Sequence, residues 1–290
     1  MMICPICCHE YDGNFSSPCS CGFEPKLVDG IFSLLPEGSF KSDGFNATHF
    51  AGLFELESQN FWFKARNLIV IWVLSRFLER SSSLLEVGCG TGFVIDAISN
   101  RFPQLKLYGS DLHHEGLSFA RTRLSSRVTL FQADARKLPF DAEFDVVAAF
   151  DVLEHIGEDE IVLAAFFRAL TPGGMLFLTV PQHAWMWSEA DDIAHHKRRY
   201  SKWELLKKVE ASGFQVVETF SFVSLLLPLM WLSRLKKKSK NNALDPAREL
   251  KIPSFLNAFL YGVMLLEFSC IRLGISLPFG GSRMVIAKKI

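Results

Sequence analysis

The segment from Leu84 to Gly92 reads LLEVGCGTG, a short apolar run that ends in a carboxylate and continues into three alternating glycines. The apolar run predicts a buried strand, and the residues after Gly92 predict a helix. A glycine-rich turn between a strand and a helix leaves backbone N–H groups free at the positive end of a helix dipole. The sequence therefore predicts that a ligand comes close to the backbone at this turn.

Segments typical of strands and of helices alternate on both sides of this turn. The expected strands lie at 84–87, 106–111, 127–134, 144–150, 175–181, 214–222 and 281–290. Helices are expected at 60–80, after Gly92, at 160–170 and at 201–213. Such alternation is typical of an α/β fold with a doubly wound, mostly parallel sheet and helices on both faces. Ligands of this fold collect at the carboxyl ends of the strands.

The glycine spacing and three acidic residues narrow the choice of ligand. Dinucleotides use the spacing G-x-G-x-x-G, whereas this turn has G-x-G-x-G and follows Glu86, which would repel a pyrophosphate. S-adenosylmethionine carries an ammonium and a carboxylate but no phosphate, so we expect it as the cofactor. Asp111 would bind its ribose hydroxyls, and Asp134 would accept a hydrogen bond from its adenine amino group. A domain that binds another nucleotide, with these acids as helix caps, is the alternative.

With these features the sequence resembles the class I S-adenosylmethionine-dependent methyltransferases over about 84–222 and the final strand. The matching segments are LLEVGCGTG, GSDL, QADARKLPF, FDVVAAFDVLEHI and LTPGGMLFLTVP. The resemblance implies a seven-stranded sheet whose last strand, MVIAKK, is an antiparallel hairpin partner. It also implies cofactor contacts at Glu86, Gly88, Gly90, Gly92, Asp111, Leu112, Asp134 and Ala135. Phe150 and Asp151 end the fourth strand and are expected to form the other wall of the cofactor site.

Methyl transfer is an in-line displacement at a sulfonium, so the alignment of the nucleophile and the exclusion of water are the main requirements. A hydroxyl acceptor also needs a base, and histidine is the usual choice near neutral pH. We expect His155 and His196 to be catalytic, with His183 and His195 as further candidates. Each histidine could instead cap a helix or pack against aromatic rings.

Two further segments flank the expected site. The basic run HKRRY at 196–200 would either clamp an anionic acceptor or form a solvated loop before a helix capped by Ser201. The helix at 60–80 carries Phe61, Trp62 and Arg66. In the resembled family such a helix often covers the cofactor, and ordinary packing of its aromatic residues is the alternative.

Five of the seven cysteines lie within the first 21 residues, and the N-terminus lacks the basic start and apolar run of a secretion signal. Cysteines clustered in such a chain indicate metal ligands rather than disulfides. We expect a structural zinc held by Cys4, Cys7, Cys19 and Cys21. The segment resembles zinc ribbons at the start of some methyltransferases and in a methyltransferase activator protein. Its second pair is tighter than usual, Cys8 and His9 are competing ligands, and reduced cysteines without metal are the alternative.

The chain is expected to divide into a zinc-ribbon-like segment at 1–36, a linker and helix at 37–83, the core at 84–222, an apolar helical hairpin at 223–280 and a final strand at 281–290. The apolar stretches at 219–233 and 252–266 are each shorter than the ~20 residues that span a bilayer. They are joined by a basic segment that contains Lys236, Lys237, Lys238 and Lys240. The hairpin would lie in a membrane surface, cover the active site or form a dimer interface.

Acidic and basic residues balance at 31 each, which argues against nucleic acid as the partner. The sequence predicts a cytoplasmic enzyme, peripheral at the membrane if the hairpin binds there. It would transfer a methyl group, preferably to oxygen, on a small apolar or lipid-linked acceptor such as a prenylated quinol or a polyprenyl-linked glycan. Methylation of an RNA base is the alternative activity, and a non-catalytic scaffold that holds partners is the alternative from another class.

Overall fold

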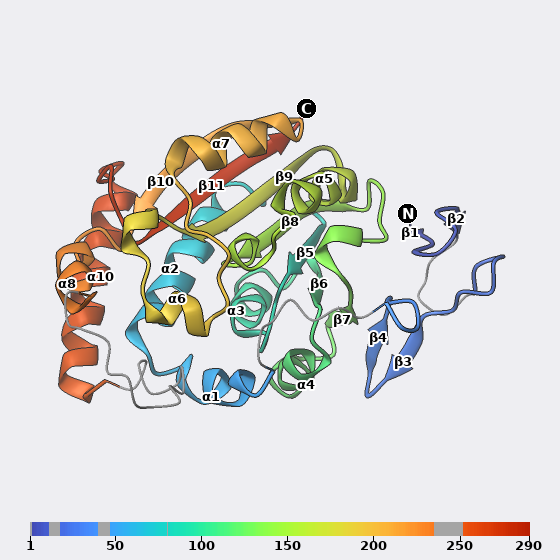
Figure 1. Ribbon diagram of the computed structural model, residues 1–290, viewed down its shortest axis with the longest axis horizontal. Helices are drawn as coiled ribbons and strands as arrows, with labels where there is room; N and C mark the ends of the chain where they lie inside the picture. The colour runs from blue at the N-terminus through green and yellow to red at the C-terminus, as the bar shows by residue number, and fades with distance from the viewer. Residues whose placement is uncertain (1, 12–17, 40–46, 80, 235–251) are drawn as a thin grey trace.

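The computed structural model describes residues 2–11, 18–39, 47–79, 81–234 and 252–290. Within these residues one nine-stranded sheet carries helices on both faces (Figure 1). The strand order is β10-β11-β9-β8-β5-β6-β7-β4-β3. This confirms the doubly wound α/β fold expected from the sequence, with two strands added to the expected seven.

The core strands are β5 (Ser83–Val87), β6 (Lys106–Asp111), β7 (Val128–Gln132), β8 (Phe144–Phe150), β9 (Leu170–Pro181), β10 (Phe214–Phe222) and β11 (Ser282–Lys289). The first five of these run parallel, and β11 pairs antiparallel with both β9 and β10. The final strand is thus the hairpin partner that the resemblance implies. β9 begins before the expected Met175, because the Thr-Pro-Gly-Gly segment joins the strand through a register shift opposite β8.

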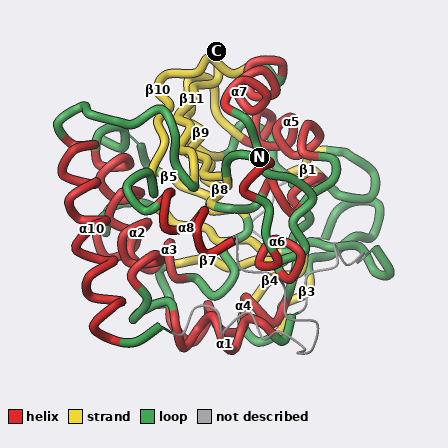
Figure 2. The backbone as a smooth tube through the Cα atoms, turned by 60° about the vertical axis from the view of Figure 1, so that its left-hand side comes forward, coloured by secondary structure: helices red, strands yellow, loops and turns green. Residues whose placement is uncertain are grey.

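Helices cover the two faces of the sheet (Figure 2). One face packs against α2 (Phe61–Ser75), α3 (Phe93–Arg101), α4 (His114–Arg123) and α10 (Ser254–Arg272). The other packs against α5 (Asp159–Ala169) and α7 (Lys202–Ala211). Successive residues of a strand point to opposite faces, so Leu84 lies in the first core and Leu85 in the second. The strand before the glycine turn is therefore held from both sides.

The N-terminal segment joins the core sheet. It contains β1 (Met2–Ile3), β2 (Glu10–Tyr11), β3 (Lys26–Val28) and β4 (Ile31–Ser33). β3 and β4 form an antiparallel hairpin, and β4 pairs parallel with β7. Ile31 is buried in one core and Leu34 in the other. The segment expected at 1–36 therefore adds two strands to the edge of the core sheet.

The apolar sequence before β11 forms α8 (Leu227–Arg234) and α10, while the lysines expected at the hairpin tip lie outside the described residues. Asn257 of α10 accepts a hydrogen bond from the backbone N–H of Phe61, at 2.8 Å. Glu267 is buried and accepts one from the N–H of Ser224, also at 2.8 Å. These contacts attach α10 to α2 and to the segment that leads into α8.

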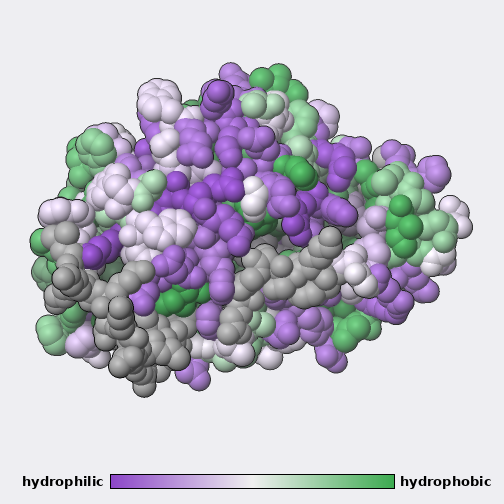
Figure 3. All heavy atoms as spheres, in the orientation of Figure 1, coloured by the Kyte–Doolittle hydropathy of each residue, from purple (hydrophilic) through white to green (hydrophobic). Residues whose placement is uncertain are grey.

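The outer face of α8 and α10 is apolar and exposed. Its exposed side chains include Trp231, Leu232, Phe255, Phe259 and Leu266. Figure 3 shows hydrophobic residues along the left margin of the molecule, the side on which Figure 1 places both helices. By length and composition α10 is the one described helix able to cross a membrane, and 22% of its apolar window is buried.

Candidate active site

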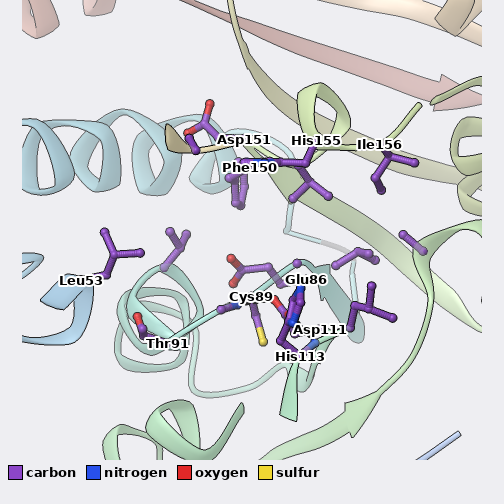
Figure 4. Close-up of a pocket in the computed structure, with 18 of the residues that line it drawn as sticks. Leu53, Glu86, Cys89, Thr91, Asp111, His113, Phe150, Asp151, His155 and Ile156 are labelled. Carbon is purple, nitrogen blue, oxygen red and sulfur yellow. Dashed lines mark hydrogen bonds between the residues drawn. The ribbon is translucent and has the colours of Figure 1, made fainter. Parts of the chain in front are cut away.

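A cavity of about 410 Å³ lies at the carboxyl ends of the parallel strands. This volume suits a small-molecule ligand. Cys89, Thr91 and Asp111 lie on one side of it, and Phe150 and His155 lie on the opposite side (Figure 4). The sequence-predicted residues that line it are Glu86, Gly88, Gly90, Asp111, Leu112, Asp134, Ala135, Phe150, Asp151, His155 and His196.

Gly88 and Gly92 of the turn allow the backbone to pack closely against neighbouring residues. At Gly88, φ is +73° and a Cβ would lie 2.5 Å from Val152 Cγ2, so a side chain has no room there. At Gly92, φ is +76° and a Cβ would lie 3.0 Å from the Cβ of Ala120 in α4. Gly92 is outside the set of residues that line the cavity. Gly92 allows the start of α3 to pack closely against α4, and the cofactor contact that the resemblance implies for it stays a prediction.

Asp111 is bonded to the turn that it faces. Its Oδ2 accepts a hydrogen bond from Gly90 N at 2.9 Å, and its Oδ1 accepts one from His113 N at 2.9 Å. A carboxylate oxygen has more than one lone pair, so these bonds leave acceptor capacity for a ligand. The acid and the glycine turn thus orient each other before a ligand binds. Its contact with a ribose diol stays a prediction.

Glu86 is the last but one residue of β5 and lines the cavity although it is only 2% exposed. Its Oε2 has no hydrogen-bond partner within the described part of the chain. Burial raises the pKa of Glu86 to about 8, an effect that the positive charge of Arg66 partly opposes. A buried carboxyl group beside a cavity fits a cationic ligand group, because the ligand would supply the missing partner. Glu86 therefore fits the methionyl ammonium of the expected cofactor.

We expect the protein to release about one proton when it binds S-adenosylhomocysteine at pH 7. Glu86, with a pKa of about 8, is mostly protonated at this pH and must ionise to pair with the ammonium of the ligand. The affinity should fall by up to about tenfold for each pH unit below 8. Calorimetry in buffers of different ionisation enthalpy measures the proton release. Glu86→Gln should bind more weakly and release none. Equal proton release by both proteins would contradict this role.

Asp134 lines the cavity but already has a strong partner. Arg136 binds its carboxylate through Nε at 2.9 Å and through Nη2 at 2.8 Å. The backbone N–H of Arg136 donates to the same carboxylate at the start of η1 (Ala135–Lys137). Part of its acceptor capacity is thus used within the chain, and its bond to an adenine amino group stays a prediction.

The helix before the core covers the cavity, as the resemblance implies. Trp62, Phe63 and Arg66 of α2 line it. Arg66 pairs through Nη1 with Oδ2 of Asp151, and its guanidinium carbon lies 4.7 Å from the ring centroid of Trp62. The ion pair joins the cover to the end of β8.

A second helix, α1 (His49–Leu56), also borders the cavity, whereas the sequence predicts only a linker and one helix at 37–83. Glu57 follows it and accepts hydrogen bonds from Thr91 Oγ1 at 2.6 Å and from Arg123 Nη1 at 2.8 Å. These bonds tie α1 to the glycine turn and to α4. The sequence of α1, HFAGLFEL, contains no motif that distinguishes it from a linker, so the helix is recognised only from its contacts in the fold.

His155 and His196 come together at the cavity wall. Their ring centroids are 4.7 Å apart, with the rings nearly perpendicular. Nδ1 of His196 lies 2.8 Å from Oδ1 of the buried Asp191, which also accepts a hydrogen bond from Arg199 Nε at 2.7 Å. Burial alone would raise the pKa of Asp191, but the bonds from His196 and Arg199 hold it well below its usual range. An ionised Asp191 thus fixes the orientation of the His196 ring.

The other two candidate histidines are outside the cavity lining. His195 is exposed to solvent. His183 stacks on Trp185 at a centroid distance of 5.3 Å, and burial, with the charges of Arg283 and Arg199, lowers its pKa. Of the four candidates, His155 and His196 line the cavity, and their catalytic role stays a prediction.

The two arginines of the basic run at 196–200 bind carboxylates of the chain, whereas the exposed Lys197 lines the cavity, so a clamp for an anionic acceptor stays a prediction. Arg198 pairs with Asp159 at 2.7 Å, and the hydroxyl of Tyr200 donates to the same carboxylate at 2.7 Å. With Arg199 bound to Asp191, the charges of both arginines are engaged within the chain. Ser201 then caps α7 by accepting a hydrogen bond from Glu204 N, as the sequence predicts.

The four cysteines expected to bind zinc meet in the N-terminal segment. The sulfur atoms of Cys4 and Cys21 are 3.5 Å apart, as are those of Cys7 and Cys19, and all four lie within 4.8 Å of one another. Tetrahedral zinc with bonds of ~2.3 Å places its sulfur ligands about 3.8 Å apart. The donor set therefore fits zinc, and Cys8 stands exposed outside it.

Residues 85–178 match the methyltransferase domain family. They are a methyltransferase domain. The matched region runs from β5 into β9 and includes the glycine turn, Asp111, Asp134, Asp151 and His155. His196, the cysteine cluster and α10 lie outside the matched region.

Two curated relatives align with the domain. A “Probable S-adenosylmethionine-dependent methyltransferase” of Mycolicibacterium smegmatis is 29% identical over 167 residues, 57% of this chain and 63% of that protein. The ubiquinone biosynthesis O-methyltransferase of Idiomarina loihiensis is 35% identical over 101 residues, 33% of this chain and 41% of that protein. The chain thus spans less than two thirds of the length of these relatives.

Solved structures give the same fold over more of the chain. A complex of the Haloferax volcanii Trm112 methyltransferase activator with a methyltransferase matches with a TM-score of 0.58 and 17% identity, over 86% of this chain and 98% of that chain. The phosphoethanolamine N-methyltransferase 2 of Haemonchus contortus, bound to S-adenosyl-L-methionine, matches with a TM-score of 0.56 and 19% identity, over 84% of this chain and 57% of that chain. At these identities the likeness establishes the class I methyltransferase fold alone.

Proposed function

We propose that this protein transfers the methyl group of S-adenosylmethionine to a hydroxyl oxygen of a small apolar or lipid-linked acceptor. The observation that carries the proposal is the composition of one cavity. Glu86 and Asp111 lie at its glycine-turn side, and the pair of His155 and His196 lines the same cavity. A zwitterionic nucleoside and an acceptor hydroxyl would thus meet in one cavity.

Each end of the cofactor has a matching group. Glu86 would pair with the methionyl ammonium, and Asp111 would bind the ribose hydroxyls. Asp134 and Ala135 would hold the adenine, with Phe150 and Asp151 as the opposite wall. Gly88 and Gly90 supply backbone without side chains where the methionyl group passes. With the cofactor held in this way, His155 and His196 would stand in the same cavity as its methyl group, where the acceptor must align with the carbon–sulfur bond.

His155 and His196 act on the acceptor hydroxyl. A neutral hydroxyl is a poor nucleophile, so its proton must leave as the oxygen–carbon bond forms. The hydrogen bond to Asp191 keeps a proton on Nδ1 of His196. Nε2 of the same ring is then the nitrogen that can accept a proton or bind a metal ion. The aromatic cover of α2 excludes water from the reacting groups.

The acceptor class is inferred from the surface and from relatives. Relatives named ubiquinone biosynthesis O-methyltransferases align with the core, and that name denotes methylation on oxygen in the synthesis of a lipid quinone. The exposed face of α8 and α10 suits contact with a membrane surface, and Arg234 and Arg272 end the two helices with positive charge. A peripheral enzyme would reach a lipid-linked acceptor in this way.

The cysteine cluster is proposed to hold a structural zinc. Four thiolates close the coordination sphere, so the ion has no open position for a substrate. The zinc ion would help to hold the hairpin of β3 and β4 at the edge of the sheet.

Incubation of the protein with radiolabelled S-adenosylmethionine and fractionated cell extract tests the function. We expect label in the organic-solvent fraction and in a base-stable bond, because a methyl ether resists alkali whereas a methyl ester does not. Glu86→Gln should label this fraction at a small part of the wild-type rate. Label in RNA would support the alternative base methyltransferase, and cofactor binding without any labelled fraction would support the scaffold.

A further inference from the structure

The turn after β8 contains a buried carboxyl group that the proposed chemistry leaves unused. Glu154 lies in η2 (Leu153–His155) and is 1% exposed. Both of its carboxylate oxygens lack a hydrogen-bond donor within the described part of the chain. An isolated carboxylate is costly to bury, so this group calls for a cation or a proton.

The nearest arginines do not supply that cation. Arg66 is engaged with Asp151, and Arg199 is engaged with Asp191, so both act on Glu154 only through their longer-range charge. Burial, followed by the charge of Asp151, raises the pKa of Glu154 well above its ordinary value. A carboxyl group in this position would be stabilised by a cation bound beside it.

Two histidines complete a donor set around Glu154. One carboxylate oxygen of Glu154 and one ring nitrogen each of His155 and His196 lie within 4.8 Å of one another. Both histidines line the cavity, which leaves an open side for a further ligand. The N–H of Lys197 donates to the backbone oxygen of Glu154 at 2.6 Å, so the loop that carries His196 is fastened to η2. The donors are therefore held together by the backbone as well as by sequence adjacency.

From this geometry we propose that Glu154, His155 and His196 bind a divalent transition-metal ion at the wall of the cavity. Two imidazoles and one carboxylate suit zinc or a similar ion better than magnesium or calcium, which prefer oxygen ligands. The bond between Asp191 and Nδ1 of His196 supports this choice, because histidines that bind metal through one nitrogen usually donate from the other to a carboxylate. With bonds of ~2.1 Å the donors would draw together to roughly 3.4 Å.

The role of the ion rests on the proposed function. Three protein ligands leave a position for the acceptor hydroxyl, whose pKa falls on coordination, so that its proton passes to water. The bound oxygen then forms a bond to the methyl carbon. The carbon–sulfur bond breaks with its electron pair remaining on sulfur, which gives the neutral thioether. The two histidines would then act as ligands, and the ion would replace a free base.

Cobalt binding tests the site without reference to activity. The full chain is first loaded with zinc at the cysteines and then titrated with Co²⁺, which gives visible d–d bands in a site of nitrogen and oxygen ligands and a thiolate charge-transfer band only if it enters the cysteine cluster. We expect one Co²⁺ per chain without the thiolate band. Zn²⁺ should displace this Co²⁺.

Glu154→Gln should weaken Co²⁺ binding at least tenfold, since loss of an outer partner of a metal ligand alone costs about 10–100-fold. The matched control is Glu160→Gln in α5, where the carboxylate is 72% exposed, and it should bind Co²⁺ like the wild type. Retained affinity for S-adenosylhomocysteine shows that Glu154→Gln is folded. No Co²⁺ bound outside the cysteines, or equal binding by the two variants, overturns the proposal. Methyl transfer that persists without this ion overturns the role given to the ion and leaves the proposed function intact, whereas Co²⁺ binding without methyl transfer supports the metal site and counts against the proposed function.

Discussion

Replacing His196 with Gln is expected to lower the turnover of methyl transfer by about 100- to 10,000-fold, the usual contribution of a group that removes a proton from the attacking atom. The loss is the same in kind whether His196 takes the proton itself or binds the ion that makes the hydroxyl acidic. The affinity for S-adenosylhomocysteine should change little, because the groups proposed to hold it lie at Glu86, the glycine turn and Asp111. Single-turnover rates with the labelled acceptor fraction measure the first effect, and calorimetry measures the second.

The neighbouring residue provides the control for this substitution. His195 is exposed and lies outside the cavity lining, so His195→Gln should keep wild-type turnover. His155→Gln should lose turnover as His196→Gln does, since the two rings are in contact. If both His155→Gln and His196→Gln turn over like the wild type, neither histidine is catalytic, and the hydroxyl is activated elsewhere.

The cofactor side of the site is predictable because its determinants are local. The strand, the turn and the helix around Gly88 to Gly92 are adjacent in sequence, and the backbone at all three glycines has positive φ. The positions of Asp111 and Asp151 are predictable because each lies at the end of a strand, and the apolar segments show where those strands end. Such features need no knowledge of distant contacts, so the fold class and this side of the site emerge from the sequence.

The acceptor side depends on contacts between segments that are far apart, and the sequence predicts it only in part. The structure has a capping box at Ser188, whose backbone N–H donates to Oδ2 of Asp191 at 2.8 Å. No pattern in the chain indicates that the capping Asp191 also orients His196. In the same way, adjacency to His155 does not reveal that Glu154 is buried without a partner. These properties depend on how the loop at 194–200 folds over η2.

The edge of the sheet was unpredictable for the same reason. β4 pairs with β7, and Ser33 donates a hydrogen bond to Oε1 of Gln132, 99 residues further along the chain, at 3.1 Å. The short segments at 26–28 and 31–33 have no length or alternation that would identify them as part of a large sheet. Parallel pairing of this kind is visible only in the assembled fold, so the N-terminal segment was expected to be a separate unit.

Because this segment is part of the sheet, loss of its zinc should have a large effect on structure. We expect Cys4→Ser to lose the zinc that a thiol-modifying mercurial releases from the wild type. Zinc in such a site contributes of order 10 kcal/mol to local folding, so the segment should unfold around the missing ligand. Ile31 and Leu34 would then become exposed, at a cost of roughly 1.5–3 kcal/mol each. Hydrogen exchange should report loss of protection at 2–4 and 26–34, with protection retained in β5 and β8.

Cys8→Ser is the matched control, since Cys8 is exposed and lies outside the group of four sulfur atoms. It should keep its zinc and the exchange pattern of the wild type. The affinity for S-adenosylhomocysteine should fall only modestly in Cys4→Ser, because β7 lies between β4 and the strands that carry Asp111 and Glu86. If the wild type yields no zinc to the mercurial and Cys4→Ser keeps full protection at 26–34, the apolar contacts of Ile31 and Leu34 hold this segment without a metal, and the cysteines have another role.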